Sequence, residues 1–359
     1  MKQEEKNAIM EDVLKLALKG RTSPNPRVGC IIMKNGSVVG KGYHKKAGLE
    51  HAEVVALRNA GVNASGGEMW INLEPCCHTG KTGPCVKAIV DASIKEVNIA
   101  MKDPNPKVNG KGIKFLEKKG VKVNVGILEK EAVRINEWYI KHITTKLPFV
   151  IMKIAMTMDE KITYPGEKYI TGKESLKFVH KIRNSVDAIM VGLNTVKVDD
   201  PHLTCRLKNG KGKSGNYRDP LRVILDSRLE IPMNSKVLKD RNVVIATTTV
   251  KKNKELVKKK NELMRKGVDV VEVNPGKKVN ISKLLKLLGK KGITSILIEG
   301  GQKLNTELLN KSIPDKVIFF ISPRSVGEGL DFMVDKKIIH LKNEITKSVG
   351  HDIMVEGYL

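Results

Sequence analysis

The sequence predicts two α/β domains in tandem, and three observations lead to this fold class. The chain has 359 residues, which is more than one ordinary domain. Short apolar strands alternate with amphipathic helices along most of its length, as they do in layered α/β domains. The alternation restarts after Lys146-Leu147-Pro148, where a helix stops before a new apolar strand. We therefore expect one domain over residues 1–146 and a second over 147–359.

The first domain is expected to open with a helix and a β-hairpin. Residues 4–19 place apolar side chains on one stripe, and Gly20 ends that helix. After a proline-rich loop over 22–27, strands over 28–33 and 37–43 flank an Asn35-Gly36 pair, the strongest short hairpin signal. The elements that follow are a helix over 51–60, a strand over 69–73, a cysteine-rich loop, a helix over 84–92, strands over 97–100 and 121–125 with a helix over 113–119 between them, and a helix from 129 to about 144.

The second domain repeats the alternation without repeating the sequence. Its helices are expected over 173–183, 251–266 and 281–290, and Gly300-Gly301 closes a strand and opens a further helix at Gln302. Backbone N–H groups at such a helix start are free to bind a phosphate. The expected strands cover 149–154, 188–191, 222–225, 243–246, 268–273, 295–298 and 317–321.

Composition and charge limit the possible functions. Aromatic residues make up only 4% of the chain, so the cores should be aliphatic. No run of eighteen apolar residues occurs and the first residues are charged, so we expect neither a membrane span nor a signal peptide, and a soluble cytoplasmic protein. The net charge of +26 suits nucleic acid or phosphorylated small molecules. Lysine runs such as 251–260 are more simply interpreted as solvated helix faces.

The cysteines indicate metal binding in a reducing compartment. Three of the five cluster at positions 76, 77 and 85, which is not the pattern of a secreted disulfide framework. Cys30 and Cys205 are expected to be buried, unreactive thiols. With His51, the thiolates of Cys76 and Cys85 form the ligand set of a catalytic zinc whose fourth position is open to water.

A carboxylate beside this metal predicts hydrolytic chemistry. Glu53 lies two residues after His51 and can stand next to the metal without binding it. Zinc lowers the pKa of bound water toward ~7, and the carboxylate can carry a proton to a departing amine, which is the chemistry of deamination. The alternative is a closed structural zinc with Cys77 or His78 as fourth ligand. Such a site would need no glutamate, and adjacent Cys76 and Cys77 cannot easily both reach one metal.

The spacing of the two cysteines favours a small substrate over a nucleic acid. Deaminases that act on nucleic acids carry Pro-Cys-x-x-Cys. Here eight residues separate Cys76 from Cys85, and they include Lys81 and Thr82 with two glycines. A loop of this kind suits an anionic group.

The motifs around these residues resemble one family, the bifunctional riboflavin-biosynthesis deaminase/reductases. In that family a diaminohydroxyphosphoribosylaminopyrimidine deaminase is joined to a 5-amino-6-(5-phosphoribosylamino)uracil reductase. The resemblance extends from about residue 8 to 355. It is carried by Pro24-Asn25-Pro26-Arg27-Val28-Gly29, Gly42-Tyr43-His44, His51-Ala52-Glu53, Leu73-Glu74-Pro75-Cys76, Gly80 to Cys85, Asp103-Pro104-Asn105-Pro106, Val191 to Arg206, Leu221 to Ser227 and Ile298-Glu299-Gly300-Gly301.

For the first half the resemblance implies a cytidine-deaminase-like α/β/α fold. One zinc ion would be bound by His51, Cys76 and Cys85, and Glu53 would be the catalytic proton shuttle. Asn25, His44, Lys81 and Thr82 would hold the substrate, 2,5-diamino-6-ribosylamino-4(3H)-pyrimidinone 5′-phosphate. Asn25 could instead be a turn residue and His44 a hydrogen-bonded loop histidine.

For the second half the resemblance implies a dihydrofolate-reductase-like α/β fold that uses NADPH to reduce the ribosyl side chain to ribityl. No Gly-x-Gly-x-x-Gly follows a strand, so the cofactor comes from the resemblance alone. The arginines would clamp the ribose phosphate. Substrate contacts fall on Lys168, Arg183, Leu203, Arg206 and Glu299, and cofactor contacts on Ala155, Tyr169, Thr171, Thr195, Asp199, Ser227, Gly301, Gln302, Lys303 and Leu304.

Two departures from the family pattern concern the reductase half. Thr157-Met158-Asp159-Glu160-Lys161 has a glutamate where the family has a glycine, and the segment before Tyr169 is one residue shorter. If that glycine served a positive φ or a close approach, Glu160 would strain or crowd the nicotinamide pocket.

Three functions follow from these observations. The leading one is a two-step enzyme of riboflavin synthesis that acts on phosphorylated pyrimidines and forms a homo-oligomer, a dimer or tetramer. The second is a zinc deaminase fused to a reductase-like module that no longer reduces. The third is a nucleic-acid or tRNA base deaminase with a basic domain, which the long cysteine spacing disfavours.

Overall fold

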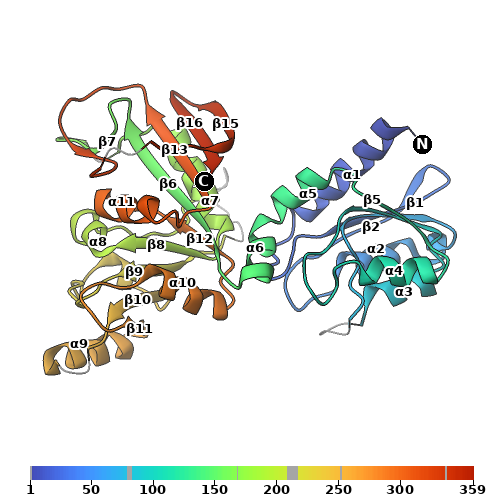
Figure 1. Cartoon of the computed structure of the whole chain (residues 1–359), viewed down its shortest axis with the longest axis horizontal. Helices are drawn as coiled ribbons and strands as arrows, with labels where there is room; N and C mark the ends of the chain where they lie inside the picture. The colour runs from blue at the N-terminus through green and yellow to red at the C-terminus, as the bar shows by residue number, and fades with distance from the viewer. Residues whose placement is uncertain (1, 79–82, 168, 208–216, 251–252, 336–337) are drawn as a thin grey trace. The chain divides into compact units, whose positions relative to one another are not determined.

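The computed structural model describes residues 2–78, 83–167, 169–207, 217–250, 253–335 and 338–359 (Figure 1). The chain divides into two compact units, Met1–Lys146 and Leu147–Leu359, each with its own sheet. Both units mix helices and strands, which confirms the predicted α/β class. In the described parts of the chain, no helix is long and apolar enough to cross a membrane.

The first unit is built on a five-stranded sheet of order β2-β1-β3-β4-β5. Strand β1 is antiparallel to β2 and β3, whereas β3, β4 and β5 are parallel. The carboxyl ends of β3 and β4 therefore meet at one edge, where Glu74 and Asp103 follow them. The strands are β1 Gly29–Lys34, β2 Ser37–Tyr43, β3 Glu68–Leu73, β4 Glu96–Met101 and β5 Lys122–Val125.

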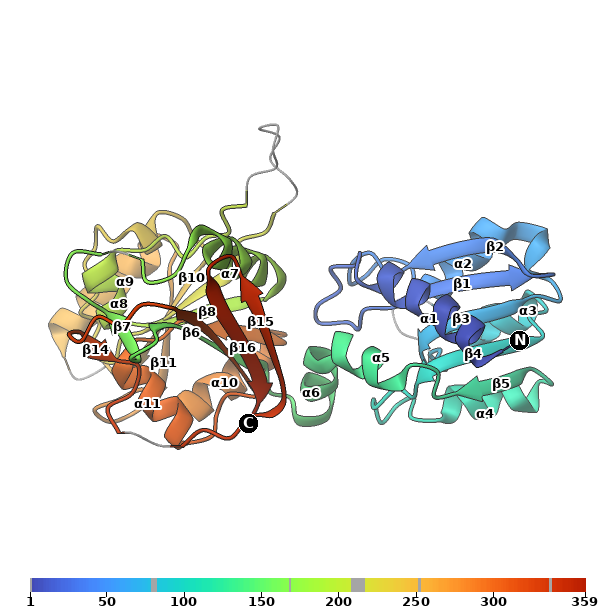
Figure 2. The same ribbon diagram turned by 90° about the horizontal axis from the view of Figure 1, so that it is seen from above.

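Helices cover both faces of this sheet (Figures 1 and 2). Helices α1 (Gln3–Ala17) and α5 (Glu129–Ile135) pack on one face, and α2 (Ala52–Ala60), α3 (Cys85–Asp91) and α4 (Lys111–Lys118) pack on the other. A short 3-10 helix, Gly61–Ala64, follows α2. The core is mainly aliphatic, and its described residues include two large aromatic side chains, Trp70 and Tyr139, which are 1% and 8% exposed.

Helix α2 lies directly on strand β2 because two strand residues have no side chain. A Cβ at Gly40 would stand 2.4 Å from the carbonyl oxygen of Ala56, and one at Gly42 would stand 2.3 Å from that of Ala52. No other residue type fits at these positions. This close contact fixes the start of α2, where His51 is the N-cap residue.

The predicted helix from 129 to about 144 is two helices. Helix α5 ends at Ile135 and α6 spans Glu137–Thr145, with Asn136 between them at φ −112° and ψ 12°. The buried Asn136 side chain accepts a hydrogen bond from the Arg27 backbone N–H and donates one to the Arg27 carbonyl oxygen. This pairing with a distant loop outweighs continuation of the helix.

The second unit is built on a nine-stranded sheet of order β11-β10-β9-β8-β12-β6-β13-β16-β15. The strands from β11 to β13 are parallel, and β16 and β15 add an antiparallel hairpin at one edge. The strands are β6 Phe149–Thr157, β8 Ala188–Gly192, β9 Leu221–Leu225, β10 Val243–Thr248, β11 Asp269–Asn274, β12 Ser295–Ile298, β13 Lys316–Ser322, β15 Lys342–Val349 and β16 Asp352–Tyr358.

Neighbouring phenylalanines on β13 show how helices cover both faces of this sheet. Phe320 meets Phe178 of α7, whereas Phe319 packs in a cluster with Leu309 of α11. Helix α10 joins α11 in the apolar layer over the central strands. The helices are α7 Lys173–Ser185, α8 Leu193–Asp199, α9 Lys254–Arg265, α10 Ile281–Lys290 and α11 Gln302–Asn310, with a 3-10 turn at Lys236–Leu238.

Several elements were not predicted from the sequence. The two-stranded pair β7 (Lys161–Thr163) and β14 (Leu330–Asp331) is too short to show a period. The outer strand β15 carries charged residues at Lys342, Glu344 and Lys347, so it lacks an apolar pattern. Such charges are usual on an edge strand, because they discourage pairing with another chain.

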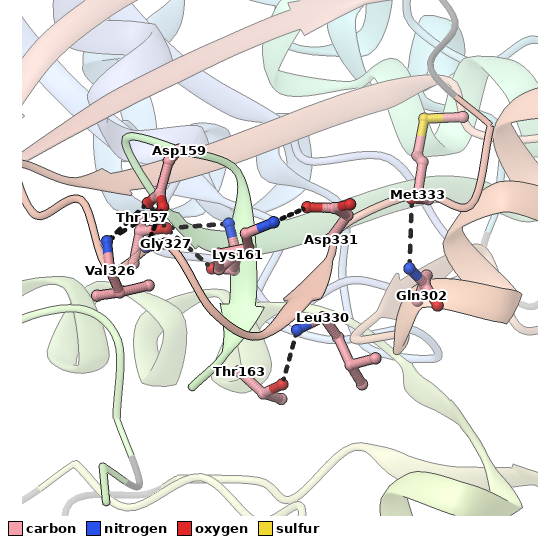
Figure 3. A network of polar contacts seen from close by, with 10 residues as sticks. All are labelled: Thr157, Asp159, Lys161, Thr163, Gln302, Val326, Gly327, Leu330, Asp331 and Met333. Carbon is pink, nitrogen blue, oxygen red and sulfur yellow. Dashed lines mark hydrogen bonds and ion pairs between the residues drawn. The ribbon is translucent and has the colours of Figure 1, made fainter. Parts of the chain in front are cut away.

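A polar network ties the turn between β6 and β7 to residues 326–334, which we call the strap (Figure 3). Asp159 accepts hydrogen bonds from the backbone N–H groups of Val326 and Gly327. Lys161 forms an ion pair with Asp331 at 2.5 Å. Farther along the strap, the Gln302 side chain donates to the Met333 carbonyl oxygen. The strap therefore connects this turn with the first turn of α11.

Glu160, in the same turn, has a φ of +68°. Of the two reasons considered for a glycine at this position, the positive φ is the one that this chain shows. The Glu160 side chain is exposed, and its carbonyl oxygen accepts a hydrogen bond from the Phe332 N–H. Glu160 therefore strains the backbone, but its side chain is not buried in the second unit.

We expect Glu160→Gly to stabilise the second unit by about 0.5–1 kcal/mol. The left-handed backbone costs a residue with a Cβ about 1–2 kcal/mol, and glycine loses about 0.5–1 kcal/mol of extra chain entropy on folding. Urea unfolding of the whole chain, followed by far-UV circular dichroism, would measure this change. Tryptophan fluorescence should not move, because Trp70 and Trp138 both lie in the first unit.

The matched control is Glu328→Gly, an exposed glutamate of the strap whose φ is not positive. It should lower stability, because only the entropic penalty of glycine applies. A Glu160→Gly protein that is destabilised as much as this control would contradict the strain argument.

Candidate active sites

Three side chains that could hold a metal ion converge at the carboxyl edge of the first sheet. The Nδ1 atom of His51 lies 3.2 Å from the Cys85 sulfur and 3.6 Å from the Cys76 sulfur. Their ligand atoms all lie within 4.8 Å of one another. His51 comes from the start of α2, Cys76 from the loop after β3, and Cys85 from the first residue of α3. The predicted zinc residues thus share one place in the fold.

Hydrogen bonds within this cluster favour a thiolate on Cys76. The Cys85 thiol and the His51 ring both donate to the Cys76 sulfur and lower its pKa to about 4. The backbone N–H of Cys85, at the start of α3, donates to the same sulfur at 3.4 Å. The hydrogen bond between the His51 ring and the Cys76 sulfur also raises the pKa of His51. A thiolate is the form that binds a metal.

Neither proposed fourth ligand of a structural zinc belongs to this group in the described residues. The Cys77 thiol instead points to the Lys107 carbonyl oxygen at 3.8 Å. His78 lines the adjoining cavity, and its Nδ1 is buried without a hydrogen-bond partner. The arrangement is that of three ligands beside an open space.

Glu53 is 4% exposed and stands in the first turn of α2. Burial raises the pKa of its carboxyl group, and the negative charge of Cys76 raises it further. A carboxyl group of raised pKa can both accept and return a proton near neutral pH. Its place beside the cysteines fits that role.

A cavity of about 540 Å³ opens next to these residues. Two of the predicted substrate residues, Asn25 and His44, line it. His44 is buried, and burial lowers its pKa, so the ring is neutral. Its Nδ1 donates to the Glu50 carbonyl oxygen at 2.9 Å, so its Nε2 accepts from the Asn25 amide at 3.1 Å. Lys81 and Thr82 lie outside the described residues.

Six polar residues of the cavity wall were given no substrate-binding role by the sequence interpretation: Glu74, His78, Asp103, Asn105, Tyr139 and His142. The Asp103-Pro104-Asn105-Pro106 motif was noticed but given no role. Tyr139 and His142 are three residues apart on α6, a spacing that places polar groups on one helix face and could have drawn attention. The Tyr139 hydroxyl donates to Asp103 at 2.9 Å.

The second unit gathers a charged cluster at the carboxyl ends of its central strands. Glu299 follows β12, and its two oxygens accept a bidentate pair of hydrogen bonds from Arg183 at 2.7 and 2.9 Å. Lys153, on β6, lies 3.2 Å from the same carboxylate. All three side chains are 11–14% exposed. Although burial alone would raise the pKa of Glu299, the two cations lower it below its ordinary value.

This cluster changes the expected role of the arginines. Arg183 was expected to clamp a phosphate, but its guanidinium is engaged by Glu299. Arg206 is exposed, and Leu203 is buried with φ +55°. Lys153 was missed, although a lone lysine within the apolar run 149–154 is an available signal.

The residues expected to bind a cofactor lie around the same strand ends. Gly301 is the N-cap residue of α11, and a side chain built on it would come within 4.0 Å only of the Thr195 hydroxyl. Gly192, before α8, likewise faces open space. In parallel sheets a ligand cleft forms at this edge.

The other expected cofactor residues are spread over several elements. Tyr169 is 48% exposed, whereas Thr171 is 9% exposed beside the start of α7. Ser227 follows β9, and its hydroxyl accepts from the Val279 N–H. Lys168 lies outside the described residues. The remaining ones are Ala155 on β6, Asp199 at the end of α8, and Gln302, Lys303 and Leu304 in the first turn of α11.

Comparison with family models gives one match in each half of the chain. Residues 3–101 match the cytidine and deoxycytidylate deaminase zinc-binding region. Residues 148–355 match the RibD C-terminal domain.

Full-length relatives and structures carry the same pair of domains. The riboflavin biosynthesis protein RibD of Aquifex aeolicus is 38% identical, covering 97% of this chain and 98% of that protein. The Escherichia coli protein of the same name is 34% identical and covers 96% of each chain. RibD of Acinetobacter baumannii superposes with a TM-score of 0.87 at 32% identity, covering 99% of each chain. A Thermotoga maritima diaminohydroxyphosphoribosylaminopyrimidine deaminase/5-amino-6-(5-phosphoribosylamino)uracil reductase superposes with 0.84, also at 32% identity and 99% coverage of each chain.

We expect the purified, metal-free chain to bind about one equivalent of cobalt(II) or zinc through the cysteine pair. Cobalt should give a thiolate charge-transfer band, which Cys85→Ser should weaken together with at least a tenfold loss of zinc affinity. Cys205→Ser, a half-buried thiol of the second unit, is the control and should leave both unchanged. Equal zinc affinity in the two variants would show that Cys85 is not a ligand.

Proposed function

The chain belongs to the RibD family of bifunctional riboflavin-biosynthesis deaminase/reductases, and we propose from this how each half works. Its deaminase domain is residues 1–146 and its reductase domain is 147–359. The first half would remove the 2-amino group of 2,5-diamino-6-ribosylamino-4(3H)-pyrimidinone 5′-phosphate. The second would reduce the ribosyl side chain of the product to give 5-amino-6-ribitylamino uracil 5′-phosphate.

The observation that carries the deaminase proposal is the cluster of one imidazole and two thiols beside a buried glutamate and a cavity. The donor set fits zinc, because nitrogen and sulfur ligands in this number leave a position open. His51, Cys76 and Cys85 would hold the ion. When bound, zinc supplies Lewis acidity that lowers the pKa of water in the cavity toward ~7.

Glu53 would move the protons of this reaction. Its carboxylate accepts a proton as water attacks the ring carbon, and the resulting carboxylic acid donates it to the departing amine. Burial supports this role, because it brings the pKa of Glu53 closer to working pH.

Asn25 and His44 would orient the pyrimidine ring. Their mutual hydrogen bond and the bond from His44 to the Glu50 carbonyl oxygen fix both side chains in the cavity wall. Such fixed polar groups discriminate between rings by their pattern of donors and acceptors. We propose that Lys81 and Thr82 hold the ribose phosphate, because an ammonium and a hydroxyl suit that anion.

In the reductase half we propose NADPH at the carboxyl edge of the second sheet. Gly192, Gly301 and the Thr195 hydroxyl leave space there, and the free N–H groups at the start of α11 suit a phosphate. The cofactor, when bound, supplies the hydride. Ala155, Tyr169, Thr171, Asp199, Ser227 and the run Gln302, Lys303 and Leu304 would complete its binding.

Lys153 is the group of the charged cluster that can give up a proton. Arginine stays protonated in proteins, and Glu299 is held as a carboxylate. We propose that Lys153 donates the proton that accompanies hydride transfer and that Glu299 and Arg183 orient it. Leu203, Arg206 and Lys168 would contact the rest of the substrate.

The two alternative functions gain no support. The relatives match both halves over almost their full length, which a fusion with an idle module or a nucleic-acid deaminase does not explain. We further propose that the protein acts in the reducing cytoplasm, where the two thiols stay free, and that it forms a homo-oligomer, a dimer or tetramer.

Glu53→Gln should abolish ammonia release while zinc stays bound. An amide cannot accept the proton, so the deaminase rate should fall by about 10²- to 10⁴-fold. Metal content by atomic absorption and NADPH oxidation on the deaminated substrate should both be unchanged. The control, Glu50→Gln, changes an exposed glutamate whose side chain pairs with Arg58. Ammonia release that survives in Glu53→Gln would remove Glu53 from the mechanism.

Glu299→Gln should impair the second activity alone. The neutral amide loses the bidentate charge pair with Arg183 and leaves two buried cations without their counter-charge, so reductase kcat should fall about tenfold or more. Ammonia release should be unaffected. Glu262→Gln on the exposed face of α9 is the control. An unchanged rate of NADPH oxidation in Glu299→Gln would show that hydride transfer does not take place at the cluster around Glu299.

A further inference from the structure

Glu74 is a buried carboxylate that the mechanism above does not use. It follows strand β3 and is 3% exposed. Its Oε2 accepts hydrogen bonds from the backbone N–H groups of Asp103 and Gly110 at 3.2 and 2.8 Å. Its Oε1 accepts from those of Gly112 and Ile113 at 2.9 and 3.2 Å. Four donors thus satisfy a charge that would otherwise be very unfavourable to bury.

Three of these donors belong to the start of α4. The first N–H groups of a helix have no partner within it, and the positive end of the helix attracts a carboxylate. The contact is close, because a Cβ on Gly112 would stand 2.2 Å from the Pro75 carbonyl oxygen. Pro75 is the single residue between Glu74 and the metal-binding Cys76. The start of α4 is therefore locked against the chain that presents this cysteine.

The fourth donor, the backbone N–H of Asp103, belongs to the loop after β4, which also lines the cavity. Asp103 and Asn105 line the cavity with Glu74 and Cys76. The Asp103 carboxylate accepts from the Asn105 N–H and from the Tyr139 hydroxyl, both at 2.9 Å. Holding the Asp103 backbone therefore also holds the polar groups that face the substrate.

We propose that Glu74 is a positioning residue of the deaminase site. Through the backbone it sets the place of Cys76 on one side and of Asp103 and Asn105 on the other. This inference rests on the deaminase function proposed above. Through these backbone contacts the Glu74 carboxylate would control both zinc retention and the fit of the pyrimidine.

Glu74→Gln tests the proposal with almost no change in shape. The amide offers one oxygen, and its NH₂ group faces N–H donors, so at least two of the four hydrogen bonds are lost. We expect zinc to be lost to a chelator about tenfold faster or more. At saturating zinc, KM for 2,5-diamino-6-ribosylamino-4(3H)-pyrimidinone 5′-phosphate should rise, and hydrogen exchange should quicken over 103–113. NADPH oxidation by the same chain is the internal control.

The matched control variant is Glu96→Gln, at the opposite end of the same sheet. Glu96 begins β4 and accepts from Asn124 at 2.7 Å and from Lys122 at 3.2 Å. Zinc retention and KM in Glu74→Gln equal to those in Glu96→Gln would overturn the proposal. So would a lower unfolding temperature with both quantities unchanged, which is the signature of a merely structural carboxylate. Zinc retention is measured without substrate. It therefore tests the positioning role of Glu74 even if the wild-type chain releases no ammonia.

Gly112→Ala probes the same contact from the other side if Glu74→Gln does not fold. Its Cβ would collide with the Pro75 carbonyl oxygen at 2.2 Å and stand 3.2 Å from Oε1 of Glu74, which would displace the start of α4 although the chain keeps its carboxylate. The same faster zinc loss and raised KM are expected. Wild-type values for both in Gly112→Ala would contradict the proposal.

Discussion

The hydrogen-bonded cluster of His51, Cys76 and Cys85 is the constraint on which the first half of the molecule depends. Two thiols and an imidazole within 4.8 Å of one another carry competing charges and protons. The fold must hold the three chain segments that carry these groups close together although their charges and protons compete. The absence of side chains at Gly40 and Gly42 brings α2 down onto β2, and the same device at Gly112 brings α4 down onto Pro75. Backbone contacts of this kind hold a site more rigidly than exposed side chains can.

Both halves place their reactive groups at the same point of an α/β layer. In the first unit Cys76 follows β3 and Asp103 follows β4, and in the second Glu299 follows β12 and pairs with Lys153 of β6. Parallel strands bring their carboxyl ends together, so residues far apart in sequence meet without long loops. The electrostatics differ, however. The first site holds thiols and a glutamate of raised pKa, whereas the second holds a glutamate kept ionised by Arg183 and Lys153.

The sequence predicted those parts of the structure that rest on local patterns. The Asn35-Gly36 hairpin, the start of α2 at His51 and the alternation of strands and helices all follow from short-range chemistry. The break at Asn136 could not be predicted, because it depends on hydrogen bonds to Arg27, more than a hundred residues away. Strand β15 has only Ile345 and Val349 as apolar residues, and it is held in the sheet by pairing with β16. In the sites, the His-x-Glu motif and the cysteines were recognisable from the sequence. The roles proposed for Lys153 and Glu74 depend on partners that only the folded chain brings close to them.

The central claim is that one chain carries two successive reactions on one phosphorylated pyrimidine. The most direct measurement supplies purified protein with zinc, NADPH and 2,5-diamino-6-ribosylamino-4(3H)-pyrimidinone 5′-phosphate, and follows ammonia and NADPH together. The account predicts that ammonia appears and that NADPH is consumed in equal amounts, with no NADPH oxidation when zinc is removed before the substrate is added. Ammonia release without NADPH oxidation, or neither reaction, would contradict it.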